Sequence, residues 1–366
     1  MRYPPHPTTP ALGTVLVTGG AGFIGRSLAA AMASAAQRWV AVDNLNPRTH
    51  GTDPQVPLPS GAHLVVADIT RAQTWDELLG EWTPDLVIHL AAETDTGLSL
   101  EHATRFADVN VGGTAAMLDA FTRHGTRPAH VLLASSRAVY GEGMWREVAT
   151  GRRFSPGQRS HQQLLAGHWD FPGSEPLPAV AGETMPHPTS IYGATKLAQE
   201  SFLSSWSCAR DVPLSVLRLQ NVYGPGQSLL NPYTGLLPLL VQRAARGESL
   251  EVYEDGAMRR DFVHIADVTR AFAAACAEPP ATSVRTLDIG CGVGAPILDV
   301  AETISATMGG GSPHVTGAFR DGDVRHTWCT TDAAEHELGW RPEIAWHEGI
   351  AAYARWYLAD HEEDPA

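Results

Sequence analysis

VLVTGGAGFIG, residues 15–25, places three glycines in a GxxGxxG pattern directly after a short apolar, β-branched run. An alanine-rich stretch, residues 26–36, follows and is typical of a helix. Glycine at positions 19, 22 and 25 lets the backbone turn tightly and approach a pyrophosphate, and the helix N-terminus adds partial positive charge. Because strand, glycine loop and helix come in the required order, the stretch predicts a dinucleotide-binding loop rather than an ordinary turn.

The next strand supports this prediction and selects the dinucleotide. Residues 39–42 form an apolar run that ends in Asp43, 18 residues after Gly25. A carboxylate at this point can accept hydrogen bonds from both ribose hydroxyls of NAD and would repel the 2′-phosphate of NADP. Arg48 lies nearby in the sequence and leaves NADP as the alternative. We therefore predict NAD as the cofactor.

Strand-like apolar runs and helical stretches alternate along the first 224 residues. The further runs are 63–67, 86–90, 131–134 and 214–219, and helices are predicted over 73–82, 105–124 and from residue 192 onward. This alternation predicts an α/β fold, a doubly wound parallel Rossmann sheet with right-handed crossovers. After Gly224, proline-rich turns with short helices and strands predict a smaller α+β domain over the carboxyl ends of the sheet.

The predicted domain organisation follows from these changes in residue pattern along the chain. Residues 1–12 form a flexible tail, and residues 13–224 form the NAD-binding domain, with an insertion at 141–188 and with 259–277 returning to it. Residues 225–359 form the smaller domain, and residues 360–366 form a flexible acidic tail. The insertion is rich in proline and glycine, and its three histidines show no metal-ligand spacing.

The composition excludes several classes of partner. The chain carries 40 acidic and 26 basic residues, a net charge of −14. Such a surface repels nucleic acid and anionic lipid, so an anionic ligand must be held by locally placed donors. Four cysteines lie far apart without a CxxC pair, so neither a zinc site nor a disulfide framework is predicted. No apolar run approaches the roughly 20 residues that span a bilayer, so a cytoplasmic protein without bound metal is expected.

A second motif carries the predicted chemistry. TSIYGATKLAQE, residues 189–200, places Tyr192 and Lys196 four positions apart on one face of a helix. A phenol beside an ammonium group can lose its proton well below its free pKa of about 10. Tyr192 is therefore predicted to take the proton from a substrate alcohol while hydride leaves the same carbon. Ser135 and Ser136 follow the run 131–134, at a strand end where parallel sheets bind ligands.

Seven motifs occur in one order along the chain: TGGAGFIG, HLAA, SSRAVYG, YGATK, NVYGP, RDFVHIADV and GDVRH. Together they resemble the extended short-chain dehydrogenase/reductase family, in particular its NAD-dependent nucleotide-sugar epimerases and dehydratases, over residues 15–357. ASSRAVYGEG, the insertion after it and QNVYGPGQSLLNPYTG are similar to the matching stretches of dTDP-L-rhamnose 4-epimerase-like members. The resemblance implies a homodimer that binds a nucleotide-diphosphate sugar, with the smaller domain holding the nucleotide.

The resemblance also assigns roles to individual residues. It implies three catalytic residues: Ser136, which holds the reacting oxygen of the sugar, Tyr192 as the base and Lys196 as its partner. The residues implied to bind NAD are Gly19, Gly22, Phe23, Ile24, Gly25, Asp43, Asn44, Asp68, Ile69, Leu90, Ala91, Ala92, Asn110, Tyr192 and Lys196. The residues implied to bind the nucleotide sugar are Ser135, Ser136, Asn221, Tyr253, Arg260, Arg320 and Asp323.

The implied mechanism is a transient oxidation at C4, and two residues indicate how the 4-keto sugar is used. Dehydratases of this family carry an Asp-Glu pair directly after the catalytic hydroxyl, whereas this chain has Arg137 and Ala138 there. We therefore predict 4-epimerisation, first of a dTDP-linked 6-deoxyhexose. Decarboxylation of UDP-glucuronate is the main alternative, ahead of 4,6-dehydration and 4-ketoreduction. A non-catalytic NAD-binding regulatory protein is disfavoured because Ser136, Tyr192 and Lys196 are all present.

Overall fold

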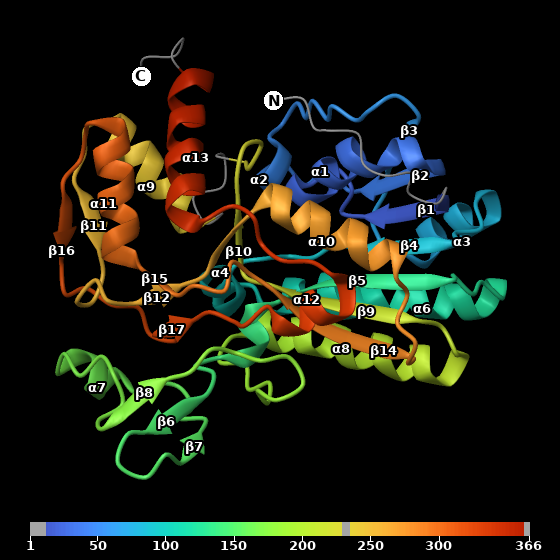
Figure 1. Cartoon of the computed structure of the whole chain (residues 1–366). Coiled ribbons are helices and arrows are strands. Elements are labelled where there is room, and N and C mark those ends of the chain that lie inside the picture. Colours follow the sequence, from blue (N-terminus) through green and yellow to red (C-terminus); the bar gives the residue numbers. More distant parts are fainter. Residues whose placement is uncertain (1–11, 229–234, 362–366) are drawn as a thin grey trace.

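The computed structural model describes residues 12–228 and 235–361 (Figure 1). The two predicted tails therefore lie outside the described residues, apart from their inner ends. Leu12 is the first residue of β1 (Leu12–Thr18), and Asp360 is the last residue of α13 (Trp346–Asp360). Within the described part of the chain, no helix is long and apolar enough to cross a membrane.

A seven-stranded sheet forms the larger half of the molecule, and the predicted fold class is confirmed. Its strands run in the order β14-β9-β5-β4-β1-β2-β3, and every neighbouring pair is parallel. Parallel strands are covered on both faces, which explains why β4 and β5 each contain an uninterrupted apolar stretch, residues 86–88 and 131–134. The remaining bounds are β2 (Ala36–Asp43), β3 (Ala62–Val66), β4 (Leu86–His89), β5 (His130–Ser136), β9 (Leu214–Leu219) and β14 (Val284–Ile289).

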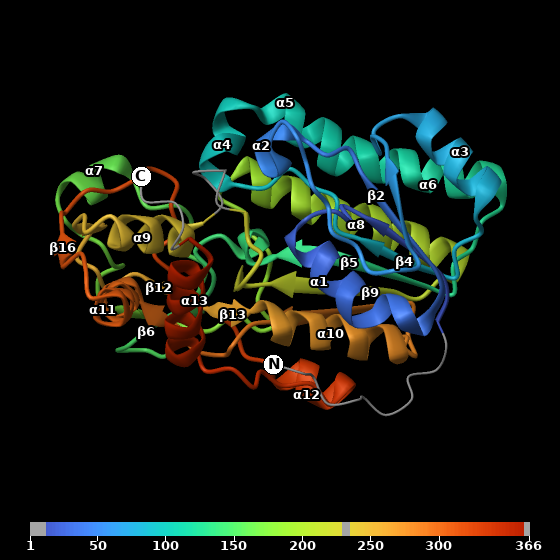
Figure 2. The same ribbon diagram turned by 90° about the horizontal axis from the view of Figure 1, so that it is seen from above.

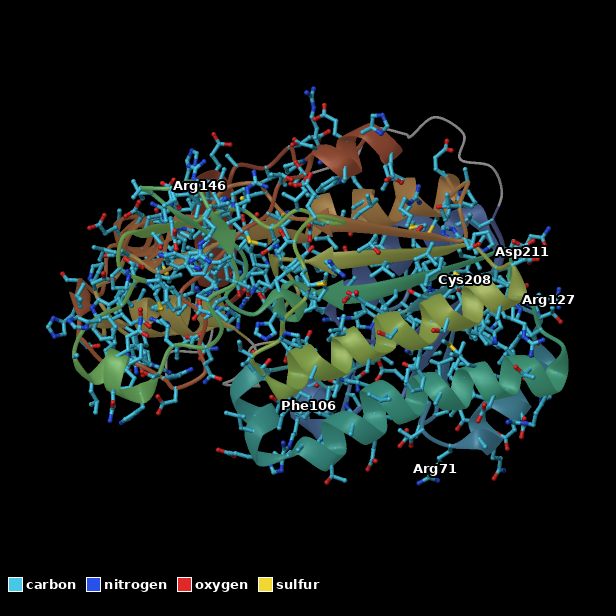
Figure 3. All side chains as sticks on the ribbon, turned by 90° about the horizontal axis from the view of Figure 1, so that it is seen from below. Arg71, Phe106, Arg127, Arg146, Cys208 and Asp211 are labelled. Carbon is cyan, nitrogen blue, oxygen red and sulfur yellow. The ribbon has the colours of Figure 1, made fainter. Side chains whose placement is uncertain are left out.

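Helices pack on both faces of this sheet (Figure 2). One face is covered by α1 (Phe23–Met32), α10 (Ile265–Ala277) and α12 (Asp332–Leu338), and the other by α3 (Ala72–Glu81), α6 (Gly113–His124) and α8 (Ile191–Arg210). The alternation of β1 divides the two cores, because Val15 and Val17 pack on the α1 side while Leu16 packs on the α3 side. Figure 3 shows α6 and α8 running side by side below the strands.

The strand β14 corrects one detail of the predicted domain boundary. Residues 284–289 fall within the range assigned to the smaller domain, yet they pair with β9 from Val284 opposite Leu214 to Ile289 opposite Leu219. An apolar run in the sequence indicates a strand but carries no information about which sheet it joins. The rest of the domain division stays a prediction.

The predicted helix over 105–124 is present and contains a π-helical turn, and a separate short helix precedes it. The structure has α4 (Thr96–Glu101), α5 (Ala103–Phe106), the π-helical turn η2 (Ala107–Gly112) and then α6. The segment after β2 contains the short helix α2 (Pro47–His50), which Asn46 caps by accepting a hydrogen bond from the Arg48 amide at 3.1 Å. A 3₁₀ turn, η1 (Ala33–Ala35), links α1 to β2.

The second part of the molecule lies at the carboxyl ends of the strands, on the left of Figure 1. Its core is formed by apolar side chains of α9 (Leu236–Ala245), α11 (Ile297–Met308) and α13, such as Leu240, Ile304 and Tyr353. Its strands are β11 (Leu250–Val252) with β16 (Pro313–Val315), β15 (Ala295–Pro296) with β12 (Arg259–Arg260) and β17 (His326–Thr327), and β10 (Asn221–Tyr223) with β13 (Phe262–His264).

The insertion at 141–188 folds as a small unit after the 3₁₀ turn η3 (Arg137–Tyr140). It has three antiparallel strands, β6 (Trp145–Glu147), β7 (Arg153–Phe154) and β8 (Ser174–Pro176), and the short helix α7 (His161–Leu165). Ion pairs of two buried arginines fasten it to the second part of the molecule: Arg159 pairs with Glu142 and Glu254, and Arg325 pairs with Glu254 and the half-exposed Asp170. We call these five residues the ion clamp.

Candidate active site

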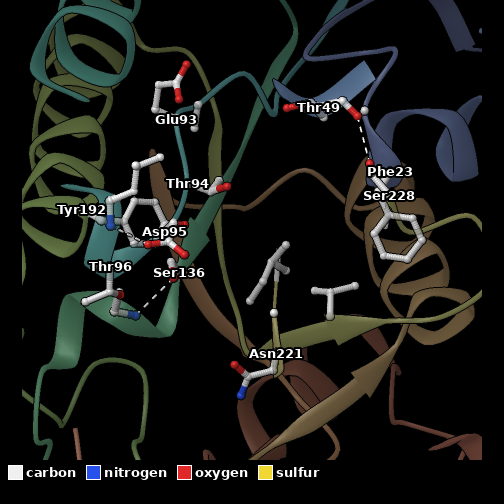
Figure 4. Close-up of a pocket in the computed structure, with 18 of the residues that line it drawn as sticks. Phe23, Thr49, Glu93, Thr94, Asp95, Thr96, Ser136, Tyr192, Asn221 and Ser228 are labelled. Carbon is white, nitrogen blue, oxygen red and sulfur yellow. Dashed lines mark hydrogen bonds between the residues drawn. The ribbon is translucent and has the colours of Figure 1, made fainter. Parts of the chain in front are cut away.

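A cavity of about 1120 Å³ lies between the carboxyl ends of the parallel strands and the second part of the molecule. It is lined by all of the site residues predicted from the sequence except Asn110. Figure 4 shows Tyr192, Asp95 and Ser136 gathered on one side of this cavity, with Phe23, Thr49 and Ser228 on the other. Ligand binding at this edge is expected of a doubly wound sheet.

The glycine loop forms one end of the cavity. Gly19 has φ of +67°, and its amide donates to Val42 O at 2.8 Å, which ties the loop to β2. A Cβ at Gly25 would lie 2.6 Å from the carbonyl oxygen of Gly20, so only glycine lets α1 begin this close to the strand. Gly22 is the N-cap of α1, and the partial positive charge of the helix N-terminus therefore faces the cavity.

Asp43 ends β2 beside this loop. Its carboxylate accepts hydrogen bonds from the Ala21 amide at 3.1 Å and from the Leu45 amide at 2.9 Å. The side chain is thereby held at the wall of the cavity, where the ribose of a dinucleotide on the glycine loop would lie. Arg48 lines the same cavity.

Ser136 and Tyr192 meet where β5 and α8 approach each other. Ser136 caps η3 by accepting from the Ala138 amide at 3.2 Å, and Ser190 caps α8 by accepting from the Gly193 amide at 3.0 Å. Tyr192 therefore stands in the first turn of α8, where its phenol is hydrogen bonded with the Ser136 hydroxyl. Its ring packs edge-on against Phe106, with ring centres 6.3 Å apart.

The electrostatics of Tyr192 differ from the sequence expectation. Burial raises the pKa of Tyr192, while the Ser136 hydrogen bond and the charge of Arg137 lower it and the charge of Asp95 raises it further. Lys196 was expected to lower this pKa, but its ammonium is hydrogen bonded to Gln199. Helical spacing brings two backbones together but does not decide where a long side chain ends.

Lys196 is directed into a buried polar network instead. Its ammonium donates to Oε1 of Gln199, and burial lowers the pKa of Lys196 to about 7. The Gln199 amide donates in turn to Thr114 Oγ1 at 2.9 Å and lies 3.2 Å from Nε2 of His89. His89 then contacts Thr18 Oγ1 at 2.7 Å through Nδ1. The network runs from the cavity into the sheet.

Asn110, predicted to contact NAD, is completely buried behind the cavity wall. Its Oδ1 accepts from the Glu93 amide at 2.7 Å, and its Nδ2 donates to Thr195 Oγ1 at 2.9 Å. The π-helical turn that carries Asn110 directs it toward the start of α8, and its predicted contact with NAD stays a prediction. Asn110 fixes the loop after β4 against the Tyr192 helix.

Ser135 lines the cavity, but its hydroxyl is turned toward α8. It donates to Glu200 Oε1 at 2.5 Å, and Glu200 forms a bidentate pair with Arg218 at 3.0 and 2.7 Å. A carboxylate that accepts three hydrogen bonds in a buried place is well compensated. Ser135 therefore joins β5 to α8 and β9, which leaves Ser136 as the serine that faces Tyr192.

The predicted substrate residues line the opposite end of the cavity. Arg260 is held by Asp323 Oδ1 at 3.0 Å and by Val324 O at 2.7 Å, so its guanidinium is oriented before any ligand arrives. The Arg320 guanidinium lies 5.3 Å from the centre of the Tyr253 ring. Asn221 accepts from Arg137 Nε at 3.1 Å. Cationic groups at this end suit a diphosphate.

Several charged residues line the cavity without having been predicted as site residues, among them Arg137 and Asp95. Arg137 was considered only because it stands where dehydratases carry an acidic residue, and no prediction was made for Asp95. Asp95 has φ of +102° and caps α4 by accepting from the Leu98 amide at 2.7 Å. Its place before a short helix carries no catalytic motif, so the sequence offers no signal for it. In the described ranges, no group of three or more His, Cys, Asp or Glu could hold a metal ion.

Comparison with known proteins gives consistent results. Residues 15–290 match the model of the NAD dependent epimerase/dehydratase family. The chain is 51% identical to dTDP-L-rhamnose 4-epimerase of Burkholderia thailandensis, over 93% of this chain and 94% of that protein. The structure of UDP-glucose 4-epimerase of Thermus thermophilus with NAD matches with a TM-score of 0.73 at 25% identity, covering 96% of this chain and 100% of that one. MoeE5 in complex with UDP-glucuronic acid and NAD matches with a TM-score of 0.72 at 27% identity, covering 95% and 100%.

Proposed function

The chain belongs to the NAD-dependent epimerase/dehydratase family, and we propose that it interconverts dTDP-L-rhamnose and its C4 epimer through a transient 4-keto sugar. One observation carries the proposal beyond the family. The hydrogen-bonded pair of Ser136 and Tyr192 faces the cavity, while the two residues after Ser136 offer no carboxylate. Such a site can oxidise and reduce C4 but has no acid and base at these positions for removing water from C5 and C6.

The residues present fit NAD as the cofactor. Gly25 lets α1 begin close against the glycine loop with its N-terminus at the cavity, and Asp43 supplies the acceptor for a ribose without a 2′-phosphate. Bound NAD would accept the hydride from C4 and return it to the other face of the ring. The residues that hold it are proposed to be those of the glycine loop, the ends of β2, β3 and β4, Tyr192 and Lys196.

The proton of the C4 hydroxyl is handled by the chain itself. Tyr192 takes this proton, and the Ser136 hydroxyl holds the C4 oxygen in line with the phenol. Arg260 and Arg320 anchor the diphosphate at the far end of the cavity while the sugar turns between the two hydride transfers. On return, Tyr192 gives the proton back to the C4 oxygen.

We further propose that the protein acts in the cytoplasm as a homodimer, bound to neither membrane nor nucleic acid. The net charge of −14 supports the last part, since anionic polymers and lipid surfaces are repelled. Light scattering on the purified protein tests the dimer, and a monomer mass would contradict it.

The test incubates the purified protein with dTDP-L-rhamnose, without added cofactor, and separates the products by chromatography with mass detection. A new product of unchanged mass is expected. Tyr192→Phe should lower turnover by about 10²- to 10⁴-fold, because it removes the base, while bound NAD is retained. Loss of carbon dioxide from UDP-glucuronate, with dTDP-L-rhamnose unchanged, would contradict the proposal. Unchanged turnover of Tyr192→Phe would contradict the mechanism.

A further inference from the structure

The insertion takes no part in the proposed proton and hydride transfers, yet it contributes a side chain to the cavity. Of residues 141–188, all of which the structure describes, only Gln158 lines the cavity wall. It lies at the end opposite the glycine loop, which Tyr253 and Gly322 also line. Gln158 is exposed, and its amide has no hydrogen-bond partner among the described residues. Both its donor and its acceptor are therefore available to a ligand.

The backbone of Gln158 is held in place by the next residue, Arg159 of the ion clamp. The Arg159 side chain is only 1% exposed. Its guanidinium donates to Glu254 Oε2 at 3.0 Å and to the carbonyl oxygen of Asp323 at 2.9 Å. Glu254 directly follows Tyr253 in the chain, and Asp323 lines the cavity itself. One buried guanidinium therefore joins three separate stretches of the cavity wall, and it fixes Gln158 relative to Tyr253.

The end of the Gln158 side chain is located by the turn at residues 320–323. A Cβ built on Gly322 would lie 3.3 Å from Gln158 Nε2, so the amide lies close to this turn. The insertion contacts the same stretch a second time through α7. Nδ1 of His161 lies 2.9 Å from Asp321 Oδ2, and the His161 ring packs against Phe319 with ring centres 5.6 Å apart. The amide is thus presented at the cavity wall by two independent contacts of the insertion.

An aromatic ring and a carboxamide at one end of a cavity are suited to a nucleobase. A base stacks on the face of an aromatic side chain, and its edge is then read by hydrogen bonds. Tyr253 supplies such a ring at this end. The carboxylate of Asp323 is already paired with Arg260 at 3.0 Å. Gln158 is neutral and offers a donor beside an acceptor, which matches the edge of a base rather than a phosphate.

We propose that Gln158 is a specificity-determining residue, whose carboxamide hydrogen bonds the edge of the pyrimidine base while the base stacks on Tyr253. The inference rests on the proposed function, because it takes the ligand to be a dTDP-linked sugar. Thymine presents a ring N–H donor beside a carbonyl acceptor, and one carboxamide can pair with both. The insertion thereby carries the residue that reads the base, and the ion clamp holds that residue in place.

The experiment measures the binding of nucleoside diphosphates to the NAD-loaded protein by isothermal titration calorimetry, so that neither turnover nor the sugar enters. The wild-type protein should bind dTDP. Gln158→Leu should weaken dTDP binding by roughly 5- to 100-fold, the range for a pair of hydrogen bonds to a base edge.

Gln162→Leu is the matched control. Gln162 belongs to the same insertion and is exposed, but it does not line the cavity. Its replacement should leave the affinity for dTDP unchanged. Equal affinities of Gln158→Leu and the wild-type protein would overturn the proposal, and so would an equal loss in Gln158→Leu and Gln162→Leu.

A second variant tests the hydrogen bonds rather than the shape of the wall. Gln158→Glu keeps the length of the side chain but replaces its donor with a second acceptor. The carboxylate repels the carbonyl oxygen of thymine, whereas the amino group of cytosine donates to it. The ratio of the affinity for dTDP to that for CDP should therefore fall by about 10-fold or more. A residue that only shapes the wall would change both affinities together, and an unchanged ratio would overturn the proposal.

The same titrations separate this inference from the proposed function. A wild-type protein without affinity for dTDP would contradict both. Tight binding of dTDP that is unaffected by Gln158→Leu would overturn the role of Gln158 alone, and the proposed epimerisation would stand.

Discussion

The two halves of the cavity are held together by opposite kinds of interaction. The cofactor half stands on the seven-stranded sheet, whose central side chains, such as Val15, Trp39 and Leu132, are apolar and fully buried. The other half depends on the insertion, which is joined to the rest by the ion clamp. In that clamp the side chains of Arg159 and Arg325 are each 1% exposed.

The two kinds of interaction differ in how precisely they position the elements, rather than in how much they stabilise the fold. Apolar contacts are non-directional, and a sheet core tolerates small shifts as long as volume is conserved. Buried ion pairs add little net stability, but each charge is costly unless its partner is in place. The clamp therefore allows few positions for the insertion, and Gln158, next to Arg159, reaches the cavity as a result. The sheet supports a generic cofactor, while the clamp shapes the end that must recognise one sugar nucleotide.

Removing one charge from the clamp should give the largest effect. Arg325→Met leaves the buried Glu254 with Arg159 alone, removes the arginine from Asp170 and Asp255, and should lower the free energy of unfolding by about 3–5 kcal/mol. Thermal denaturation measures the loss. The KM for the nucleotide sugar should rise while NAD content stays constant.

Arg146→Met is the control for that change. Arg146 projects from the surface of the insertion (Figure 3) and pairs with Glu175, with both side chains nearly half exposed. An exposed pair is worth at most about 1 kcal/mol. An equal loss of unfolding free energy in Arg325→Met and Arg146→Met would contradict the distinction between the clamp and an ordinary surface ion pair.

Mild acid should destabilise the sheet before it protonates Asp170 of the clamp. His89 and His130 are buried, and desolvation lowers the pKa of each to about 3. The unfolded chain binds protons at these histidines below pH 6.5 while the folded chain does not, so stability falls as pH falls from 6.5 toward 3. At pH 5 this amounts to roughly 2 kcal/mol per histidine.

Within the clamp, the Asp170 carboxylate should stay ionised over the same range. A hydrogen bond from His326, together with Arg325, holds the pKa of Asp170 below its ordinary value. Its contribution is therefore lost only at pH values below the unfolded pKa of about 3.9. Urea denaturation at pH 7 and pH 5 measures the difference, and His130→Asn should remove its share of the pH dependence. A free energy of unfolding that is the same at both pH values would count against this account.

Two glycine substitutions should give the smallest effects: one should weaken NAD binding, and the other should stabilise the protein. Gly25→Ala places a Cβ 2.6 Å from a backbone oxygen in the cofactor loop and should weaken NAD binding by about 1–3 kcal/mol. Gly80→Ala, in α3, meets no atom within 4 Å and should stabilise the protein by up to about 1 kcal/mol. NAD content and thermal denaturation distinguish the two. Unchanged NAD binding in Gly25→Ala would mean that the loop adapts more than its geometry indicates.

Local patterns predicted the features that depend on neighbours in sequence. The glycine loop, Asp43 and the apolar strand runs all combine residue type with short spacing, and the structure has them where expected. The pairing of β14 with β9 depends on residues 70 positions apart, which no local pattern encodes. The contact of Lys196 with Gln199 and the inward turn of Asn110 depend on side-chain direction. These are decided by packing against other elements rather than by spacing.

The late arrival of β14 has a consequence for how the protein is made. On the ribosome, β9 emerges with β5 already available on one side, but its other edge stays open until residues 284–289 follow. All of β10 to β13 must be synthesised in between. A nascent chain therefore carries an unpaired parallel edge during this interval, the kind of edge that recruits other strands. The cofactor half is completed only after α9 and β10 to β13 of the substrate half have been made, so the two halves mature together during translation.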